Sequence, residues 1–478
     1  MPVPVLAPVV PAPAPVVAAK DKVNTVADNF LFTSKFAAPA GMYLFDLQNN
    51  GGKSRVHLRM EADSNGLLVV NAAKMIHLNP TAAQMAYQHF TQKNNRVALR
   101  NLAKVFNAPA RQLEQDYQQV ISRLDALVDE GSDLCPICDL GLDMDMPFSA
   151  KLSAPYRMDL ALTYRCNNNC SHCYNARARS YPEMDTNAWK QVLDRIWQLR
   201  IPHVVFTGGE PTLRADLVEL VGYAQKLGMV TGLNTNGRKL SDPGFVNELV
   251  AAGLDHVQIT LESHLPAIHD EMVLARGAWE ETTAGLRNCI NSRLYVMTNT
   301  TLLRNNAPFL ADTLNYLADL HVPTIGLNAL IYSGRGAEVQ TGLNESELPV
   351  LLSLAEEHCE KSGQRLIWYT PTQYCHFNPL LLQLGVKGCT AAYHNMCIEP
   401  DGQVIPCQSY YESLGHILKD SWDSVWNHPL ALDLRERRSI PEGCLACDFL
   451  KECGGGCPLA RGHQNIQPIP VMSFMLEE

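Results

Sequence analysis

The feature that most constrains the fold is a regular alternation of strand and helix patterns over residues 156–370. Short runs rich in Val, Ile and Thr are each followed by an amphipathic helical segment, a repeat that is typical of parallel strands joined by helices. We therefore predict an α/β fold, a partial (β/α)6 TIM-like barrel, with its chemistry at the carboxyl ends of the strands. The predicted strands span residues 157–164, 203–209, 229–237, 255–262, 294–301 and 324–331.

A different pattern precedes the barrel, because residues 31–130 place strand patterns before three helical ones. Asn65-Gly66 is a typical hairpin turn between two strands. Asn79 is expected to cap the first helix, with Pro80 at its first position. Strands are expected within 41–79, and helices at 80–92, 94–106 and 109–129.

Composition excludes several classes of protein. The chain of 478 residues has a formal net charge of −10, which argues against a general affinity for nucleic acid or anionic membrane. It has no apolar run of the roughly 18 residues that a membrane span needs. Residues 1–30, rich in Pro, Ala and Val, lack the basic start and unbroken apolar core of a signal peptide, so we expect a disordered tail. We therefore expect a soluble cytoplasmic protein that binds neither nucleic acid nor membrane.

Three cysteines directly follow the first predicted barrel strand, in the sequence CNNNCSHC. Cysteines in a chain without an export signal are more often metal ligands than disulfides. A structural zinc ion needs four ligands, whereas a cubane iron–sulfur cluster on three cysteines keeps one iron open for another molecule. For zinc, His172 is the alternative fourth ligand, but its neighbour Cys173 cannot easily turn onto the same ion. We therefore predict a cluster with one open iron on Cys166, Cys170 and Cys173.

Cysteines also gather in residues 371–478, in two spaced patterns. The pattern C-x2-C-x5-C-x3-C comprises Cys444, Cys447, Cys453 and Cys457. The pattern C-x12-G-x4-C runs from Cys389 to Cys407. Because this region is rich in Cys and Gly and has little hydrophobic periodicity, we expect metal rather than apolar burial to hold it together. A zinc ribbon is the alternative.

The sequence FTGGEP, residues 206–211 at the end of the second predicted strand, narrows the interpretation of the cysteine triplet to one family. Together they resemble the radical S-adenosylmethionine (SAM) enzymes, in which such a triplet holds a [4Fe-4S] cluster whose open iron binds SAM. The resemblance implies that glycine backbone approaches the SAM ammonium and that Glu210 neutralises it. At the position of His172 that family more often has Tyr or Phe. The implied SAM contacts are Gly208, Gly209, Glu210, His172, Asn234, Thr260 and Arg276, the last three having ordinary polar loop residues as the alternative.

The C-terminal cysteines resemble the SPASM extension of the same enzymes, which holds two auxiliary [4Fe-4S] clusters. The resemblance implies that the first is bound by Cys389, Cys397, Cys407 and Cys457. It implies that the second is bound by Cys444, Cys447 and Cys453. The family's usual last cysteine is absent, because no cysteine follows Cys457. A fourth ligand for the second cluster must then be His463, a carboxylate, the CPIC pair, water or substrate.

Five cysteines remain outside these sets. Cys289 and Cys359 fall in helical patterns and are expected to be small buried hydrophobes. Cys135 and Cys138 form the CPIC pair, for which zinc binding, cluster binding and a plain thiol pair stay open. Cys375 could face the barrel mouth as a hydrogen-atom donor or a stray ligand, against a purely structural role.

The front domain resembles the PqqD-like recognition elements, small winged-helix folds in maturases of ribosomally made peptides (RiPPs). The segment GLLVVNAAKMIHLNPTAAQMAYQHF carries the likeness. It implies that the leader of a precursor peptide adds a strand to the sheet edge. We expect one basic helix face to attract acidic leader residues, with a solvated face as the alternative. This face comprises Lys93, Arg96, Arg100 and Lys104.

These resemblances predict a radical SAM/SPASM enzyme that modifies a ribosomally synthesised precursor peptide. A donor such as flavodoxin or ferredoxin would reduce the cluster, and the 5′-deoxyadenosyl radical from SAM would abstract a hydrogen atom from the peptide. Crosslink or thioether formation, excision and epimerisation all begin with that step, so the product stays open. The alternatives are a sulfatase-type maturase acting on a protein and, in another class, a zinc-stabilised winged-helix adaptor or regulator. The predicted parts are the tail 1–30, the PqqD-like domain 31–130, a CPIC linker 131–155, the barrel 156–370 and the SPASM domain 371–478.

Overall fold

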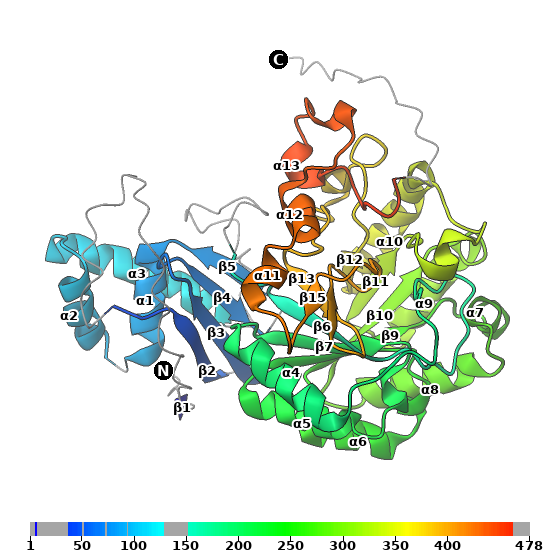
Figure 1. Cartoon of the computed structure of the whole chain (residues 1–478), viewed down its shortest axis with the longest axis horizontal. Coiled ribbons are helices and arrows are strands. Elements are labelled where there is room, and N and C mark those ends of the chain that lie inside the picture. The colour runs from blue at the N-terminus through cyan, green and yellow to red at the C-terminus, as the bar shows by residue number, and fades with distance from the viewer. Residues whose placement is uncertain are drawn as a thin grey trace. The chain divides into compact units, whose positions relative to one another are not determined.

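The computed structural model describes residues 5–6, 37–49, 52–71, 74–92, 94–128 and 152–461. It divides into two compact units, Met1–Ser153 and Ala154–Glu478 (Figure 1). Most of the predicted tail and linker lies outside the described residues, as do Lys93, the CPIC cysteines Cys135 and Cys138, and His463. Within the described ranges, the helices are too short or too polar to cross a membrane.

The N-terminal unit contains one antiparallel sheet whose strands are paired in sequence order. Its strands are β1 (Val5–Leu6), β2 (Gly41–Asn49), β3 (Gly52–Met60), β4 (Gly66–Val70) and β5 (Lys74–Leu78). The predicted turn before Gly66 is present, because the Glu61 amide donates to the Asn65 carbonyl at 2.8 Å. β1 falls within the predicted tail, where it pairs with Phe45 and Asp46 of β2.

Three helices follow the sheet: α1 (Pro80–Thr91), α2 (Asn95–Val105) and α3 (Ala110–Val128). α1 begins as predicted, because the Asn79 side chain accepts a hydrogen bond from the Ala82 amide at 2.9 Å. Apolar side chains of α1 and α3, such as Phe90 and Leu124, share a core with the sheet residue Phe45. The expected order of strands and then three helices is confirmed. The PqqD-like winged-helix identity of this unit stays a prediction.

The second unit is built on a ten-stranded sheet in which β6 to β12 are parallel neighbours in sequence order. These strands are β6 (Arg157–Thr163), β7 (His203–Gly208), β8 (Val230–Thr235), β9 (His256–Thr260), β10 (Tyr295–Thr301), β11 (Thr324–Asn328) and β12 (Arg365–Trp368). All six strands predicted from the sequence are present. β12 was missed, because four residues are too few to give a periodic signal.

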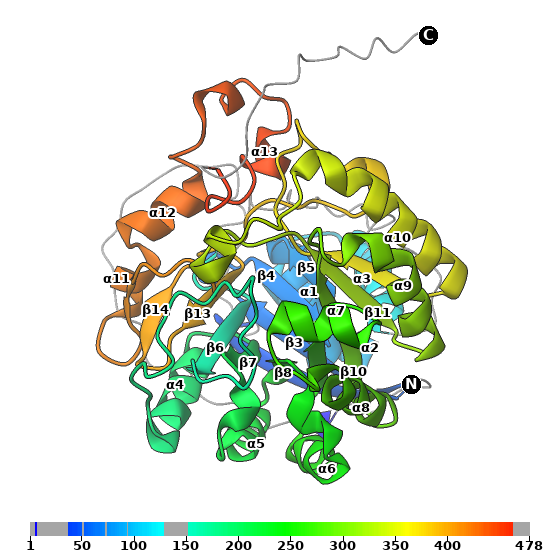
Figure 2. The ribbon, with the colours of Figure 1, turned by 90° about the vertical axis from the view of Figure 1, so that its right-hand side faces the viewer.

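Helices cover the outer face of the curved parallel sheet (Figure 2). They are α4 (Thr186–Gln198), α5 (Leu217–Leu227), α6 (Pro243–Ala252), α8 (Ala278–Ile290), α9 (Leu310–Asp319) and α10 (Leu348–Ser362). In contrast, α7 (Pro266–Val273) packs on α8 and contacts residues 169–171 of the loop after β6. On α4, Trp189, Val192 and Ile196 recur at helical spacing and are fully buried. Burying each such side chain contributes about 1.5–3 kcal/mol, which holds the helices to the sheet and fixes the strand ends that they connect.

The C-terminal region extends the same sheet, which corrects one prediction. β13 (Asn395–Ile398) pairs in parallel with β6, and β14 (Gln403–Ile405) and β15 (Gly415–His416) continue antiparallel. Met396, Ile398, Val404 and Ile405 are fully buried. The expectation that metal rather than apolar burial holds this region together is therefore wrong for these strands. They are too short for their alternation to show in the sequence. The short helices α11 (Trp422–Trp426), α12 (Pro429–Glu436) and α13 (Leu450–Cys453) follow.

Candidate active site

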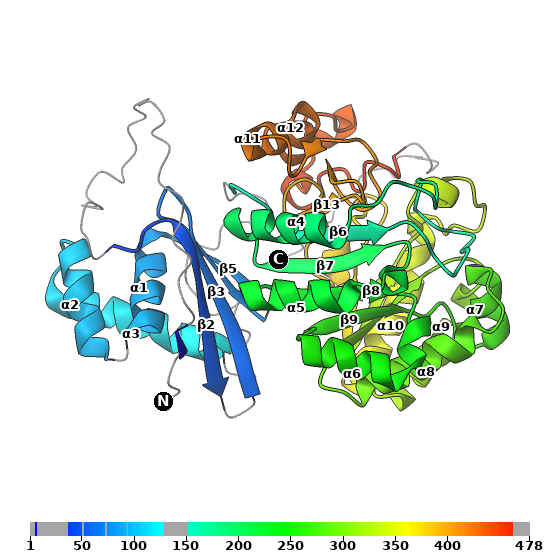
Figure 3. The ribbon, with the colours of Figure 1, turned by 60° about the horizontal axis from the view of Figure 1, so that its bottom comes forward.

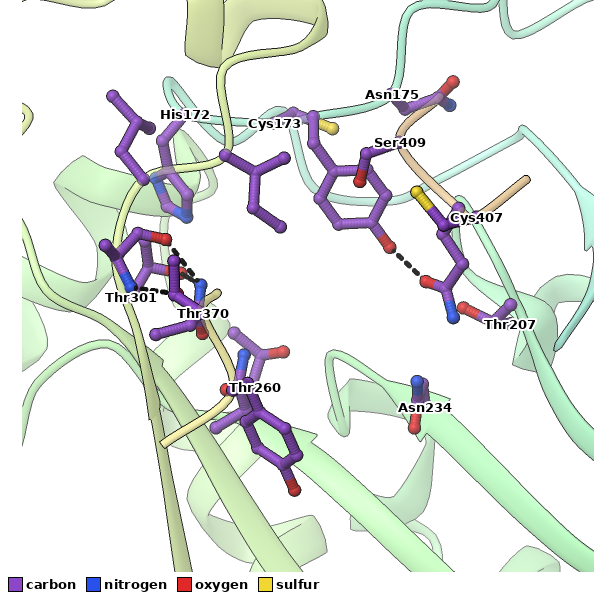
Figure 4. Close-up of a pocket in the computed structure, with 18 of the residues that line it drawn as sticks. His172, Cys173, Asn175, Thr207, Asn234, Thr260, Thr301, Thr370, Cys407 and Ser409 are labelled. Atoms are coloured by element: carbon purple, nitrogen blue, oxygen red, sulfur yellow. Dashed lines mark hydrogen bonds between the residues drawn. The ribbon is translucent and has the colours of Figure 1, made fainter. Parts of the chain in front are cut away.

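A cavity of about 900 Å³ opens at the carboxyl ends of the parallel strands. Polar side chains from successive strand ends line it, including Thr207, Asn234, Thr260 and Thr301 (Figure 4). This volume is in the upper range for small-molecule sites and is sufficient for a nucleoside-sized cofactor. The parallel sheet therefore places the cavity where such folds bind ligands.

The three predicted cluster ligands all line this cavity, on the loop between β6 and α4. Burial, together with the neighbouring charges of Glu210 and Cys173, raises the pKa of Cys166 to about 11. Burial also raises the pKa of Cys170 well above its ordinary value, and the charges of Cys173 and Cys166 add to this effect. The raised pKa values keep these thiols protonated when no metal is bound. A bound cation would be needed to hold them as thiolates, and iron fits this donor set.

Three arginines from separate parts of the chain hold the loop in place. Arg179, Arg238 and Arg335 each donate to oxygen atoms of residues 166–169. The Arg335 Nη1 atom, for example, lies 2.7 Å from Oδ1 of Asn169. These contacts fix the backbone between the first two cysteines, and the guanidinium charges offset the negative charge of a thiolate cluster.

The two glycines of GGEP bring the end of β7 against the cysteine loop. A Cβ atom at Gly208 would lie 2.1 Å from the Thr163 carbonyl oxygen, and one at Gly209 would lie 2.4 Å from that of Arg165. The Gly209 amide donates to the Thr163 carbonyl at 2.7 Å. Both glycines line the cavity, so their backbone is open to a ligand. This arrangement supports the predicted close approach of backbone to SAM.

Glu210 is fully buried and is not among the residues that line the cavity. Its Oε1 atom accepts from the hydroxyls of Thr212 and Thr235, each at 2.7 Å, and Oε2 accepts from the Asn236 amide at 2.8 Å. Burial raises the pKa of Glu210, and these hydrogen bonds oppose the rise. The carboxylate therefore ties the end of β7 to the end of β8 behind the cavity wall. Its predicted contact with the SAM ammonium stays a prediction.

The predicted SAM residues His172, Asn234 and Thr260 all line the cavity (Figure 4). The His172 Nε2 atom lies 2.9 Å from Oε1 of Glu262, whose Oε2 accepts from the Thr301 amide at 2.9 Å. This pairing fixes the imidazole ring. Its buried Nδ1 atom makes no hydrogen bond within the described part of the chain. Glu262 was not among the residues predicted from the sequence, although it lies only two positions after Thr260.

Two predicted residues are not brought to the cavity. Arg276 is exposed beyond the end of α7, where Leu274 ends the helix with φ 47°. Cys375 is also exposed and does not line the cavity, so a role as a hydrogen-atom donor there finds no support in its position.

Three of the four cysteines predicted for the first auxiliary cluster line the same cavity: Cys389, Cys407 and Cys457. Burial and the charges of Cys389 and Cys457 raise the pKa of Cys407 to about 12. Cys397 differs, because it is fully buried on β13 in an apolar cluster beside β6, although it lies within electrostatic reach of Cys407. The structure thus brings three of this set together at the cavity and leaves Cys397 behind its wall.

The cysteines predicted for the second auxiliary cluster lie outside the cavity, around α13. Burial raises the pKa of Cys444, and the charges of Cys453 and Cys447 raise it further. Cys453 is buried, whereas Cys447 is exposed. This second group therefore lies partly at the surface. Among the described residues, no three His, Cys, Asp or Glu side chains are arranged to hold a metal ion as they stand.

In this parallel barrel, the loop after the first strand places three thiols at a cavity that two glycines also line. This arrangement is the one expected of the radical SAM enzymes. Family comparison agrees, because the radical SAM superfamily matches residues 160–317 and the iron–sulfur cluster-binding SPASM domain matches residues 389–448.

Known proteins are similar over most of their own length. The mycofactocin maturase MftC of Mycobacterium ulcerans is 30% identical over 329 residues, which cover 66% of this chain and 86% of MftC. The PqqA peptide cyclase of Rhizobium meliloti is 27% identical over 319 residues, 64% of this chain and 83% of the cyclase. Among solved structures, Streptococcus suis SuiB bound to the precursor peptide SuiA is similar, with a TM-score of 0.63 and 15% identity. The match covers 85% of this chain and 95% of the SuiB chain.

The chain therefore belongs to the radical SAM superfamily and is a radical SAM enzyme with a SPASM domain. Membership implies [4Fe-4S] clusters and the binding of SAM. The three thiols on the loop after β6, the glycine backbone that lines the cavity and the unpartnered Nδ1 atom of His172 fit these groups.

Proposed function

We propose that this enzyme modifies a ribosomally synthesised precursor peptide. One observation carries the proposal: a single cavity connects the loop of Cys166 and Cys173 with Cys389, Cys407 and Cys457. A peptide side chain placed in it would therefore meet both predicted cluster sites. Two of the similar proteins support a peptide substrate, since one is a peptide cyclase and the other was solved with a precursor peptide.

When bound, the reduced cluster and SAM supply a 5′-deoxyadenosyl radical that removes a hydrogen atom from the substrate. The residues of the chain position and shield that chemistry. The three arginines fix the cysteine loop, and Glu262 orients His172. Ile367 and the buried Trp368 form an apolar part of the wall, which excludes water from a reactive intermediate. The protein therefore contributes geometry and protection rather than acid–base chemistry.

The two auxiliary sites are proposed to have different roles. Cys389, Cys407 and Cys457 face the cavity, so a cluster there could accept an electron from the substrate or bind a substrate thiolate. Cys444 and Cys447 lie near the surface, so a cluster there could exchange electrons with a donor such as flavodoxin or ferredoxin. Two auxiliary clusters favour an oxidative outcome such as a crosslink or thioether.

Co-expression with a short peptide encoded beside the gene tests the function. We expect the peptide to change only when the enzyme is intact, and mass spectrometry to distinguish the outcomes. Loss of two hydrogens would indicate a crosslink or thioether, loss of a residue-sized fragment would indicate excision, and an unchanged mass with altered stereochemistry would indicate epimerisation. A peptide unchanged in mass and stereochemistry, with SAM still cleaved, would contradict a peptide substrate.

The N-terminal unit is proposed to bind the leader of that peptide. β2 is nine residues long, and among the described residues β1 pairs with Phe45 and Asp46 at its outer edge, so this edge is proposed as the place of strand addition. Arg96, Arg100 and Lys104 are exposed on α2. Figures 1 and 3 show that α1 and α3 lie between the sheet and α2. A leader that binds both the edge of β2 and the basic residues of α2 must therefore extend across the helices.

Charge reversal on α2 tests the second feature. The Arg96→Glu/Arg100→Glu variant is expected to bind the precursor about tenfold more weakly, with reduced dependence on salt, because two favourable pairs become repulsive. Lys226→Glu/Lys361→Glu changes the net charge equally at exposed sites of the other unit and should leave the Kd unchanged. An unaltered Kd for the α2 variant in a fluorescence titration removes the basic face from the proposal.

A further inference from the structure

The second auxiliary site is one ligand short in its own sequence motif. It has Cys444, Cys447 and Cys453, and the chain beyond Cys457 contains no cysteine. A [4Fe-4S] cluster that only carries electrons is normally held by four cysteines. The missing ligand must therefore come from another part of the chain, from solvent or from a substrate.

The segment after β12 packs directly on this site. The Tyr374 amide donates to the Cys453 sulfur at 3.4 Å, and the Cys453 thiol donates to the Thr372 carbonyl at 3.5 Å. The rings of Tyr374 and Phe449 lie 6.0 Å apart. A Cβ atom at Gly456 would lie 3.2 Å from the Gln373 amide nitrogen. Backbone and side chains thus hold residues 372–374 against the cysteine loop.

Cys375 is the next residue along this segment. It directly follows Tyr374, whose amide contacts the Cys453 sulfur, so Cys375 lies beside the cysteine loop. It also remains exposed and away from the main cavity, as the group near Cys447 does.

The His376 side chain, next to Cys375 in the sequence, is already engaged with Glu345. The Nδ1 atom of His376 lies 2.7 Å from Oε2 of Glu345. Both side chains are largely buried in this pair, and the Glu345 carboxylate also meets the Gln373 amide at 3.4 Å. Recruiting either one would break the buried pair, whereas the Cys375 thiol can bind iron without such a loss. Glu452 on α13 has a buried Oε2 atom without a hydrogen-bond partner among the described residues, so it is the rival ligand that the iron count of a Cys375→Ala variant distinguishes.

We propose that Cys375 is the fourth ligand of the second auxiliary cluster, together with Cys444, Cys447 and Cys453. The inference rests on the two auxiliary sites of the proposed function and assigns one of them a closed coordination shell. A cluster with four thiolates has no free iron for a substrate, so this site transfers electrons. Substrate binding then falls to the first auxiliary site, which faces the cavity.

The test uses the full chain carrying Cys166→Ala/Cys170→Ala/Cys173→Ala, so that only auxiliary iron is counted after anaerobic reconstitution. We expect about eight irons per chain in this background. Adding Cys375→Ala should remove about four irons, or about one with a paramagnetic [3Fe-4S] signal after oxidation, and Cys375→Ser should retain more iron than Cys375→Ala. Adding Cys359→Ala, a buried thiol on α10, serves as the matched control and should leave iron and spectra unchanged.

An iron count and an electron paramagnetic resonance spectrum that do not change with Cys375→Ala would overturn the assignment. A background chain with only about four irons would also overturn it, because no second cluster would exist to be completed. Since no peptide is present, neither result depends on whether the enzyme modifies a peptide. A failure of the peptide experiment would likewise leave the iron count as it stands.

Discussion

Replacing Cys170 by alanine is expected to abolish the reductive cleavage of SAM and to remove about four irons per chain. Burial of the Cys170 sulfur and the charges of Cys173 and Cys166 raise its pKa, and its loss leaves two cysteines, too few for a cluster with one open iron. The fall in 5′-deoxyadenosine formation should exceed about 10³-fold, because without the cluster no electron reaches SAM.

Iron and sulfide analysis and chromatography of 5′-deoxyadenosine measure both effects after anaerobic reconstitution. Cys289→Ala is the matched control, since that thiol is buried on α8 away from the cavity, and it should keep iron and activity. Retention of full iron and SAM cleavage in Cys170→Ala would show that the cluster is held elsewhere.

The second large effect is expected for Glu210→Ala. This change leaves the Asn236 amide and the hydroxyls of Thr212 and Thr235 without their acceptor in a buried place. Each unsatisfied group costs about 1–3 kcal/mol, so we expect the free energy of unfolding to fall by about 3–5 kcal/mol. SAM affinity should fall as well, because the same carboxylate holds the ends of β7 and β8 that line the cavity.

A graded series separates this role from a simple loss of charge. Glu210→Gln keeps the shape and one acceptor, so its loss of stability in urea unfolding should be smaller than that of Glu210→Ala. Glu248→Ala, at an exposed position of α6, should change stability by no more than about 0.5 kcal/mol. If Glu210→Ala kept wild-type stability while SAM binding was lost, Glu210 would contact SAM directly, as the sequence first suggested.

The sequence was informative wherever a residue pattern repeats or a motif is short and local. The alternating strands of the barrel, the Asn79 cap and the three helices of the N-terminal unit are all present. The three cysteines and the two glycines of GGEP also reach one cavity, because the carboxyl ends of parallel strands meet at one edge.

Features that depend on contacts between distant segments could not be predicted. β13 to β15 are two to four residues long, and the pairing of β13 with β6 has no local signal. The Glu210 carboxylate lies behind the cavity because it accepts hydrogen bonds from the hydroxyls of Thr212 and Thr235. The spacing of these residues in the sequence does not reveal this contact. Only the fold brings the segment of Cys375 next to Cys453, since 78 positions separate the two cysteines in the sequence (453 − 375).

One measurement tests the central claim most directly: the wild-type chain, reconstituted with iron and sulfide without air, is treated with dithionite and SAM, and 5′-deoxyadenosine is quantified. The account predicts 5′-deoxyadenosine and methionine in equal amounts, and neither product from the Cys166→Ala/Cys170→Ala/Cys173→Ala chain. Iron-loaded wild-type protein that leaves SAM intact would contradict it.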